Sequence, residues 1–220
     1  MTHHVTQPSN KEKAYSYIKE AVIARDFLPG DAVNERAIAK KLVMNSGPVR
    51  MAMEDLIEEG WLMASPSASA PRVTPVTKRH VTEITQLRLA LEPMVVEQIM
   101  PRLGRKQMAY LDALLSQHDR LRVMPDAMEQ FVGLDRSFHL YLASLTENNK
   151  LLQIMQSLFE TLRRIEPGHL LAGNRFGACF EEHRTLVDSL RHADCAAAKE
   201  AICRHIDHDH DAIVFHIQEC

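Results

Sequence analysis

An aspartate and three histidines of this 220-residue chain are residue types that could together hold a metal ion. Asp135 and His139 are spaced i, i+4 within GLDRSFHLYLASL, so on a helix they share one face. His183 lies in FEEHRTLVDSL and His205 in AKEAICRHIDHDH, on two further predicted helices. One carboxylate and three imidazoles from facing helices of a bundle can hold a divalent metal ion and leave positions open for water or a ligand.

The other histidines leave alternative assignments open, because a single histidine is more often a polar surface residue or a satisfied buried one than a metal ligand. We expect one of these two non-ligand roles for His3, His4, His80, His118, His169 and His192. The C-terminal histidines are ambiguous from the residues alone, since interleaved aspartates also fit a solvated polar face. These histidines are His205, His208, His210 and His216.

The part of the chain that must position these side chains reads as helices only. After Thr77, hydrophobic periodicity predicts helices over about 78–101, 105–122, 127–146, 149–166, 176–191 and 194–217. The breaks between them fall at Asn148-Asn149, Pro167-Gly168 and Ala193-Asp194. No strand-like alternation interrupts this pattern, so we expect an all-α bundle.

Residues before Thr77 have a different organisation. Helices are predicted over 11–26, 35–42 and 46–59, with Asn34 and Ser46 as N-caps of the second and third and Gly60 as the C-terminal stop. Short extended pieces, Trp61-Leu62-Met63 and Arg72-Val73-Thr74, flank a loop rich in Ser, Ala and Pro. Three short helices followed by a hairpin predict a winged helix-turn-helix domain.

In such a domain the recognition helix enters the major groove and presents its N-terminal residues to base edges. Arg50 lies in the first turns of that helix, and Arg36 opens the preceding one, which crosses the DNA backbone. Residues 34–50 hold four basic side chains and one acid, although the whole chain has a net charge of −3. This local positive patch favours contact with phosphate, while spacing alone also allows two ordinary surface arginines.

Composition narrows the class of protein further. The chain is 45% hydrophobic and 25% charged, as in ordinary soluble globular proteins. No apolar run approaches the roughly 20 residues of a membrane helix, and the N-terminus lacks the apolar core of a signal peptide. We therefore expect a cytoplasmic protein without a membrane partner. The cysteines form no CxxC pair and are expected to be free thiols; they are Cys179, Cys195, Cys203 and Cys220.

The stretch YIKEAVIARDFLPGDAVNERAIAKKL…PVRMAMEDLIEEGWL resembles the N-terminal domain of GntR regulators. The matching pieces are Leu28-Pro29-Gly30-Asp31, Glu35-Arg36-x-Ile38-Ala39, Pro48-Val49-Arg50 and Leu56-x-x-x-Gly60. The resemblance implies that Arg36 and Arg50 contact double-stranded operator DNA, and we add Ser46 and Arg72 to this predicted surface. Ser46 stands where the family usually has an arginine, and the wing lacks the family's usual glycine.

The remainder resembles the FadR-like C-terminal ligand-binding (FCD) domain. The matching pieces are Arg88-x-x-x-Glu92, Asp135-x-x-Phe138-His139, Glu182-His183, Asp194 and Ala198-x-x-Ala201-x-x-x-His205-Ile206. The resemblance implies a bundle with a central cavity and a homodimer. The metal ligands it implies are Asp135, His139, His183 and His205, with Zn or Ni favoured and Mn, Co or Fe accepted.

The same resemblance implies that a small organic acid binds beside the metal. Arg88 is the expected partner for its carboxylate. Equally, Arg88 can form an intrahelical pair with Glu92, four residues later. The residues alone leave both assignments open.

Three hypotheses compete for these residues. The first is a metabolite-responsive transcriptional regulator that contains a metal and senses a carboxylate. The second is a regulator whose helical domain binds another ligand, with metal absent or structural, and the third is a small metal-dependent enzyme that uses the same Asp/His site. The sequence has no HExxH motif, nucleophile elbow or Gly-rich phosphate loop, and Glu182, beside His183, is expected on a different helix face. Regulation needs only binding and explains the attached DNA-reading module. We therefore predict a non-enzymatic regulator with a winged helix-turn-helix domain over residues 1–76 and a helical effector domain over 77–220.

Overall fold

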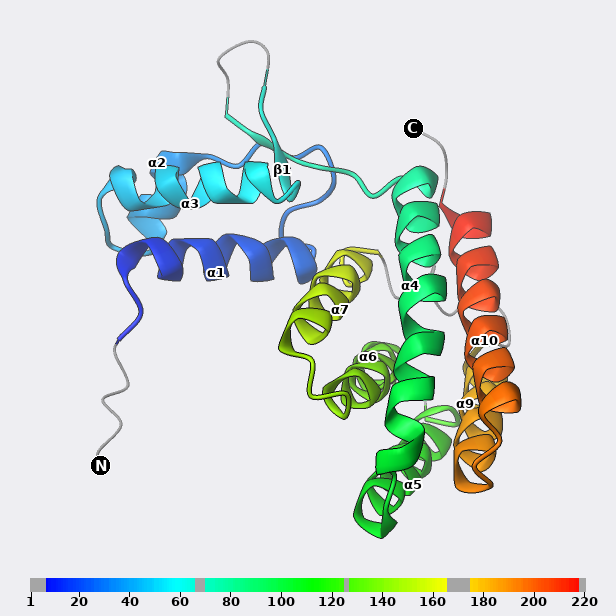
Figure 1. Ribbon diagram of the computed structural model, residues 1–220. Coiled ribbons are helices and arrows are strands. Elements are labelled where there is room, and N and C mark those ends of the chain that lie inside the picture. The colour runs from blue at the N-terminus through cyan, green and yellow to red at the C-terminus, as the bar shows by residue number, and fades with distance from the viewer. Residues whose placement is uncertain (1–6, 66–69, 125–126, 166–174, 218–220) are drawn as a thin grey trace, which may run out of the picture. The chain divides into compact units, whose positions relative to one another are not determined.

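The computed structural model describes residues 7–65, 70–124, 127–165 and 175–217, and the statements below concern these residues. Its internal contacts divide the chain into two compact units, Met1–Val76 and Thr77–Cys220. Both units are seen in Figure 1, and each is described by itself. The predicted features that fall on Pro167-Gly168, on the centre of the wing loop and on His3, His4, His169 and Cys220 lie outside the described residues.

The first unit contains three helices and a two-stranded sheet among its described residues. Helices α1 (Asn10–Ile23), α2 (Glu35–Lys41) and α3 (Ser46–Glu58) precede β1 (Leu62–Met63) and β2 (Arg72–Val73). The strands are antiparallel, with Leu62 opposite Val73. α3 packs against α1 and α2, and β1 packs against α3. The predicted winged helix-turn-helix is therefore confirmed as the architecture of this unit.

Local signals set the ends of these helices. Asn34 caps α2, because its side-chain oxygen accepts a hydrogen bond from the first turn. Gly60 follows α3 with φ 74°, a left-handed conformation that glycine adopts without steric cost. The predicted cap at Ser46 is wrong by one residue, since α3 begins at Ser46 and its N-cap is Asn45. Asn45 itself makes no side-chain hydrogen bond as a cap.

One cluster of buried apolar side chains holds this unit together. The helices contribute inward-facing residues at helical spacing, and the two strands add one inward residue each. Its members are Ala14, Ile18, Val22, Val33, Ile38, Ala39, Val49, Ala52, Met53, Leu56, Trp61, Leu62 and Val73. The polar faces of α2 and α3 are left to solvent.

The second unit is helical throughout its described residues, as predicted. Its elements are α4 (Lys78–Ile99), the 3₁₀ turn η1 (Met100–Arg102), α5 (Arg105–Leu121), α6 (Met128–Ser144), α7 (Asn149–Leu162), α9 (Arg175–Arg191) and α10 (Cys195–His216). α10 packs along both α4 and α9, as Figure 1 shows, while α6 contacts α4, α5 and α7. The bundle therefore brings α4, α6, α9 and α10 around one interior.

Two of the predicted breaks between helices supply N-cap residues. The Asn148 side chain accepts hydrogen bonds from the N–H groups of Lys150 and Leu151, which makes Asn148 the N-cap of α7. Asp194 accepts from Ala197 N and starts α10 in the same way. Among the described residues, no helix is both long and apolar enough to cross a bilayer.

Candidate functional site

The four side chains proposed as metal ligands meet inside the helical unit. Asp135 and His139 lie one turn apart on α6, His183 comes from α9, and His205 comes from α10. One donor atom from each residue lies within 4.8 Å of the donor atoms of the others. The three imidazoles are buried, at 1%, 0% and 1% exposure, and Asp135 is partly buried. We call this group the Asp/His cluster.

The imidazoles of the Asp/His cluster meet through their Nε2 atoms. The Nε2 atom of His139 lies 3.1 Å from Nε2 of His205 and 3.4 Å from Nε2 of His183. The Oδ1 atom of Asp135 lies 3.4 Å from Nε2 of His183 and 3.8 Å from those of the other two histidines. Ligand bonds of about 2.1 Å place neighbouring donors around one ion roughly 3–3.5 Å apart. The spacing therefore fits a single divalent ion.

Two of the imidazoles are oriented from behind by carboxylates. Glu92 Oε2 on α4 lies 2.6 Å from His139 Nδ1, and Glu182 Oε2 on α9 lies 2.9 Å from His205 Nδ1. A carboxylate accepts the Nδ1 proton, which leaves the Nε2 lone pair facing the other donors. The chemistry and the orientation of the donor set therefore fit a metal ion.

Cys179, on α9, completes the surroundings of the remaining two ligands. Its thiol donates a hydrogen bond to Asp135 Oδ1 at 3.4 Å and lies 4.0 Å from His183 Nδ1. Burial, together with the nearby Asp135 charge, raises the pKa of the Cys179 thiol well above its usual value. The thiol is therefore a protonated donor that orients the carboxylate.

The electrostatics of the Asp/His cluster favour positive charge at its α10 side. Burial opposes the charged form of His205, but the Asp209 and Glu182 carboxylates overcome it and raise the pKa of His205 to about 9. Burial and the neighbouring imidazoles lower the pKa of His183 well below its usual value. The surrounding carboxylates thus attract positive charge, and a metal cation would supply it.

Arg88, on α4, links this cluster to a pocket. Its Nε atom donates to Glu92 Oε1 at 2.6 Å, so the intrahelical pair that the sequence left open does form. Its guanidinium lies 4.9 Å from the centre of the Phe159 ring, and Nη1 lies 3.4 Å from Asp209 Oδ2. Only 3% of Arg88 is exposed, and Nη2 has no hydrogen-bond partner among the described residues. One buried donor therefore remains for another acceptor.

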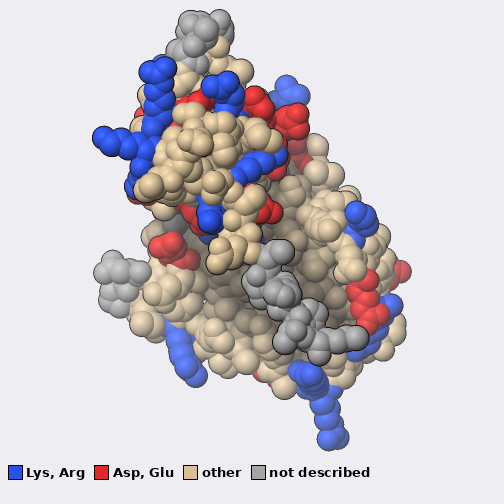
Figure 2. Space-filling model, turned by 90° about the vertical axis from the view of Figure 1, so that its left-hand side faces the viewer, with Lys and Arg blue, Asp and Glu red and all other residues tan. Residues whose placement is uncertain are grey.

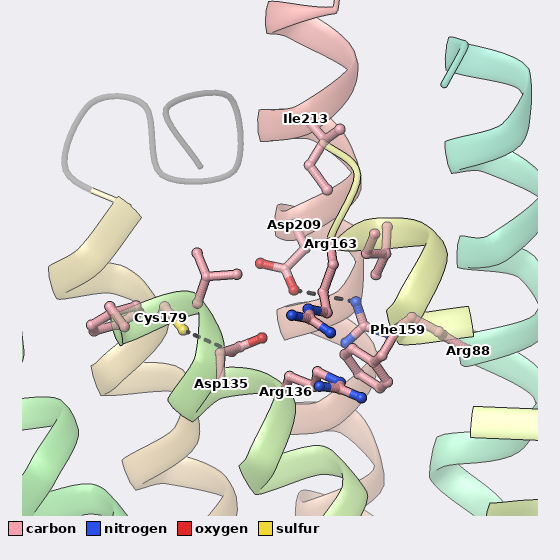
Figure 3. A pocket seen from close by; sticks show the side chains of 11 residues that line it. Arg88, Asp135, Arg136, Phe159, Arg163, Cys179, Asp209 and Ile213 are labelled. Atoms are coloured by element: carbon pink, nitrogen blue, oxygen red, sulfur yellow. Dashed lines mark hydrogen bonds and ion pairs between the residues drawn. The ribbon is translucent and has the colours of Figure 1, made fainter. Parts of the chain in front are cut away.

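Figure 3 shows the pocket that Arg88 and Asp209 line. The space within its lining is about 500 Å³ when the open solvent at its mouth is included, and only a small part of it is enclosed. Arg88, Asp135 and Asp209 form a charged part of its wall, and Arg136 and Arg163 also line it. The remaining lining is mostly apolar: Phe131, Val132, Phe159, Leu162, Cys179 and Ile213. An apolar pocket with a few converging polar groups is the usual form of a small-molecule site.

The structure adds two residues to the site that the sequence did not single out, Arg175 and Asp209, which form a largely buried ion pair at the α9–α10 interface. Glu182, expected on a different helix face from His183, also belongs to the surroundings of the site, because its carboxylate reaches His205 across the same interface. Asp209 stands four residues after His205, which is a spacing that could have identified it, whereas no local signal marks Arg175.

The predicted DNA-contact residues lie on the first unit. Arg36 is exposed in the first turn of α2, and Ser46 is the first residue of α3. Arg50 is 65% exposed and holds Glu35 through two contacts, of 3.1 and 3.2 Å. Arg72, in β2, is exposed and donates Nη1 to a backbone carbonyl oxygen at 2.7 Å. Lys and Arg side chains (blue) project from this unit near the top of Figure 2.

Comparisons with known proteins agree with this architecture. Residues 83–208 match the profile of the FCD domain, and residues 10–70 match that of the bacterial regulatory proteins of the gntR family. The chain is 31% identical over 178 residues to the HTH-type transcriptional regulator McbR of Escherichia coli (strain K12), covering 80% of this chain and 78% of that protein. It is 23% identical over 195 residues to the HTH-type transcriptional regulator YdhC of Bacillus subtilis (strain 168), covering 89% and 87%.

A solved structure shares the whole fold. The crystal structure of a GntR transcriptional regulator from Rhodococcus sp. RHA1 superposes with a TM-score of 0.78 at 21% identity, covering 96% of this chain and all of that chain (100%). A winged helix-turn-helix unit joined to an FCD-type helical unit defines a bacterial transcriptional regulator. The chain belongs to the GntR family, in the group that carries an FCD domain. The first domain implies DNA binding, and the second implies a small-molecule effector.

Proposed function

We propose that this protein is a dimeric, metabolite-responsive transcriptional regulator whose helical unit binds a small organic acid beside a divalent metal ion. One observation carries the proposal: three buried imidazoles turn Nε2 toward one another and toward Asp135, next to a pocket that contains Arg88. In this proposal Met1–Val76 is the DNA-binding domain and Thr77–Cys220 is the effector domain.

The proposed metal ligands are Asp135, His139, His183 and His205. Three imidazoles and one carboxylate suit Zn²⁺ or Ni²⁺, and also accept Mn²⁺, Co²⁺ or Fe²⁺. When bound, the ion supplies a Lewis-acidic position for an oxygen ligand. The protein's own contribution is orientation, since Glu92 and Glu182 hold the His139 and His205 rings by their Nδ1 atoms.

The proposed effector is a small carboxylate. Arg88 offers a buried guanidinium with an unpaired Nη2, and a buried cation of this kind binds a carboxylate by charge-assisted hydrogen bonds. Arg136 and Arg163 add positive charge to the same pocket, while its apolar walls accommodate a carbon skeleton. A ligand with no acceptor atom at this position would leave the Arg88 donor unmatched, at a cost of about 1–3 kcal/mol.

DNA reading is assigned to the N-terminal half of α3 and the surfaces beside it. Arg50 and Arg36 are the principal proposed contacts, and Ser46 and Arg72 complete the surface. Their support is the exposure of the arginines and the position of Ser46 at the first turn of the recognition helix. A two-fold dimer would read a pseudo-palindromic operator.

Coupling between the two proposed sites runs along α4. This helix begins at Lys78, two residues after the boundary at Val76, and it carries Arg88. α10 holds α4 through the Thr82–His210 hydrogen bond of 3.1 Å and through the Arg88–Asp209 contact. An effector that changes these contacts acts on the helix that continues directly from the DNA-binding unit. Coupling free energies of this kind are typically about 1–3 kcal/mol.

Elemental analysis of the purified full-length protein tests the metal site. We expect close to one divalent ion per chain in the wild type and loss of that ion in the His139→Ala/His183→Ala variant. The matched control is His192→Ala, because His192 is exposed and hydrogen-bonds only a backbone carbonyl oxygen in its own helical turn. Normal metal content in the double variant would refute the assigned ligands.

A second measurement tests the effector assignment. Calorimetric titration of wild-type protein with citrate, succinate and acetate, before and after EDTA treatment, should show binding that weakens on chelation. Arg88→Gln should weaken carboxylate binding without removing the metal, since Arg88 is not a proposed ligand. A carboxylate affinity that changes neither in Arg88→Gln nor after EDTA treatment would contradict the proposed site.

A further inference from the structure

The Asp209 carboxylate lies between two buried arginines that come from different helices. Its Oδ1 accepts from Arg175 Nη2 at 2.6 Å and from Arg175 Nε at 3.2 Å. Its Oδ2 lies 3.4 Å from Arg88 Nη1 and 3.1 Å from His205 Nε2. Arg175 is 6% exposed and Arg88 is 3% exposed. A carboxylate of the protein therefore occupies the space between Arg88 and the Asp/His cluster.

The two arginines hold Asp209 unequally. Arg175 approaches Oδ1 closely and also contacts Glu182 at 2.8 Å, so it anchors Asp209 from the α9 side. Arg88 makes a single long contact, and its second terminal nitrogen is unpaired. A carboxylate that faced both terminal nitrogens of Arg88 would form two parallel hydrogen bonds, which is the stronger geometry. Asp209 therefore contacts only one of the two terminal nitrogens of Arg88, namely Nη1.

The net charge of the buried groups around the Asp/His cluster also bears on how a carboxylate can bind here. With the imidazoles neutral, as metal ligands must be, Arg88 and Arg175 contribute +2 and four buried or partly buried acids contribute −4, which leaves −2 for a divalent cation to balance. The acids counted are Glu92, Asp135, Glu182 and Asp209. With the ion bound, these groups are neutral overall, apart from the charge that Arg136 and Arg163 add to the pocket. A further carboxylate therefore competes with the resident acids for the buried cations.

We propose that Arg88 and Arg175 frame a carboxylate subsite whose resident occupant is Asp209, and that an effector carboxylate competes with Asp209 for Arg88. This inference rests on the proposed effector site and names the residue that sets its affinity. Arg175 retains Asp209 on the α9 side while the incoming carboxylate takes both terminal nitrogens of Arg88. The exchange replaces an α10–α4 contact with an effector–α4 contact, so that occupancy of the subsite alters how α10 holds α4.

Chemical rescue tests the subsite with a known probe. Asp209→Ala removes the resident carboxylate and leaves room for a free one of similar size. The melting temperature of the full-length protein is measured in sodium acetate and in sodium chloride of equal ionic strength. We expect Asp209→Ala to melt below the wild type and to be raised several degrees more by acetate than by chloride. The wild type and Asp207→Ala, which changes an exposed acid on the same helix, should respond equally to both salts.

A second variant covers the case in which Asp209→Ala does not fold. Asp209→Asn keeps the shape of the side chain and removes its charge, and calorimetric titration with acetate should then give a Kd at least roughly ten-fold lower than for the wild type. Equal responses of Asp209→Ala to acetate and chloride, or an unchanged acetate Kd in Asp209→Asn, would overturn the proposal.

Metal analysis of the same samples separates this inference from the proposed metal site. Acetate rescue in protein that holds no metal would support the proposed carboxylate subsite and contradict the proposed metal site, because Arg88 and Arg175 need no ion to bind a carboxylate. Intact metal content without acetate rescue would support the metal site and contradict the subsite.

Discussion

Glu92 Oε2 on α4 lies 2.6 Å from His139 Nδ1 on α6, and the other oxygen of the same carboxylate accepts a hydrogen bond from Arg88 Nε at 2.6 Å. One carboxylate therefore orients a proposed metal ligand and the proposed effector arginine together. Burial disfavours the charged form of Glu92, but Arg88 and His139 overcome it and lower the pKa of Glu92 to about 2. The metal centre and the effector pocket share this residue.

The first prediction concerns Glu92→Gln. An amide can donate to His139 Nδ1, which would put the ring proton on Nε2 and remove the lone pair that a metal needs. We expect the affinity for Zn²⁺ to fall roughly 10–100-fold, measured by competition with a chromophoric chelator. Glu97→Gln is the control, because Glu97 lies on the same helix and pairs with Lys199 at the surface. Equal Zn²⁺ affinities in both variants would exclude an orienting role for Glu92.

The second prediction concerns His118, on α5. Its ring is fully buried, packs 4.9 Å from Phe131 and 5.1 Å from His183 between ring centres, and has no hydrogen-bond partner for either nitrogen among the described residues. His118→Leu replaces unpaired polar atoms with apolar ones of similar volume. We expect the free energy of unfolding to rise by about 1 kcal/mol in urea titrations.

The control for His118→Leu is His192→Leu, a substitution at an exposed histidine. It should change the free energy of unfolding by less than about 0.5 kcal/mol. A loss of several kcal/mol in His118→Leu would mean that the imidazole makes an essential interaction.

The third prediction concerns the turn between α2 and α3. Val43 has φ 52° and is 92% exposed, so a β-branched residue is held in a left-handed conformation without burial to offset it. Asparagine tolerates this conformation better. Val43→Asn should raise the free energy of unfolding of the full chain by up to about 1 kcal/mol. Val123→Asn changes an exposed valine that is not among the positive-φ residues and should have no such effect.

The fourth prediction concerns DNA binding by Arg50. Removal of a guanidinium that contacts a base edge costs about 1–3 kcal/mol, so Arg50→Ala should weaken binding to the promoter of its own gene by roughly 10–100-fold in gel shifts. Arg105→Ala, which removes an exposed charge from α5, should leave binding unchanged. Arg50 pairs with Glu35, so both variants should also be compared for stability. An unchanged shift in Arg50→Ala would remove this residue from the interface.

Local sequence signals were sufficient for most of the fold. The helices fall within a few residues of their predicted ranges, and Asn34 begins and Gly60 ends a helix as predicted, because capping depends on neighbouring backbone groups. Asn148 and Asp194 lie at predicted breaks and cap the helices that follow. The predicted cap at Ser46 is displaced by one residue to Asn45, because local preferences fix the end of a helix only to within a residue or two.

Only part of the Asp/His cluster could be predicted from residue spacing in the sequence. The i, i+4 spacing of Asp135 and His139 puts both on one face of α6 whatever the rest of the chain does. Resemblance to a family, rather than spacing, selected His183 and His205 from among the other histidines. That these four residues bind metal, and that Arg36, Ser46, Arg50, Arg72 and Arg88 bind DNA or effector, remain predictions.

The sequence by itself determined where helices begin and end and which residues share a helix face, since both follow from interactions within a few residues. Only the tertiary structure decided that Glu182 faces His205 and that Asp209 lies between Arg88 and Arg175. These contacts depend on how α10 is rotated about its axis where it packs against both α4 and α9. That rotation is set by the fit of the whole bundle interior, which no short stretch of sequence encodes.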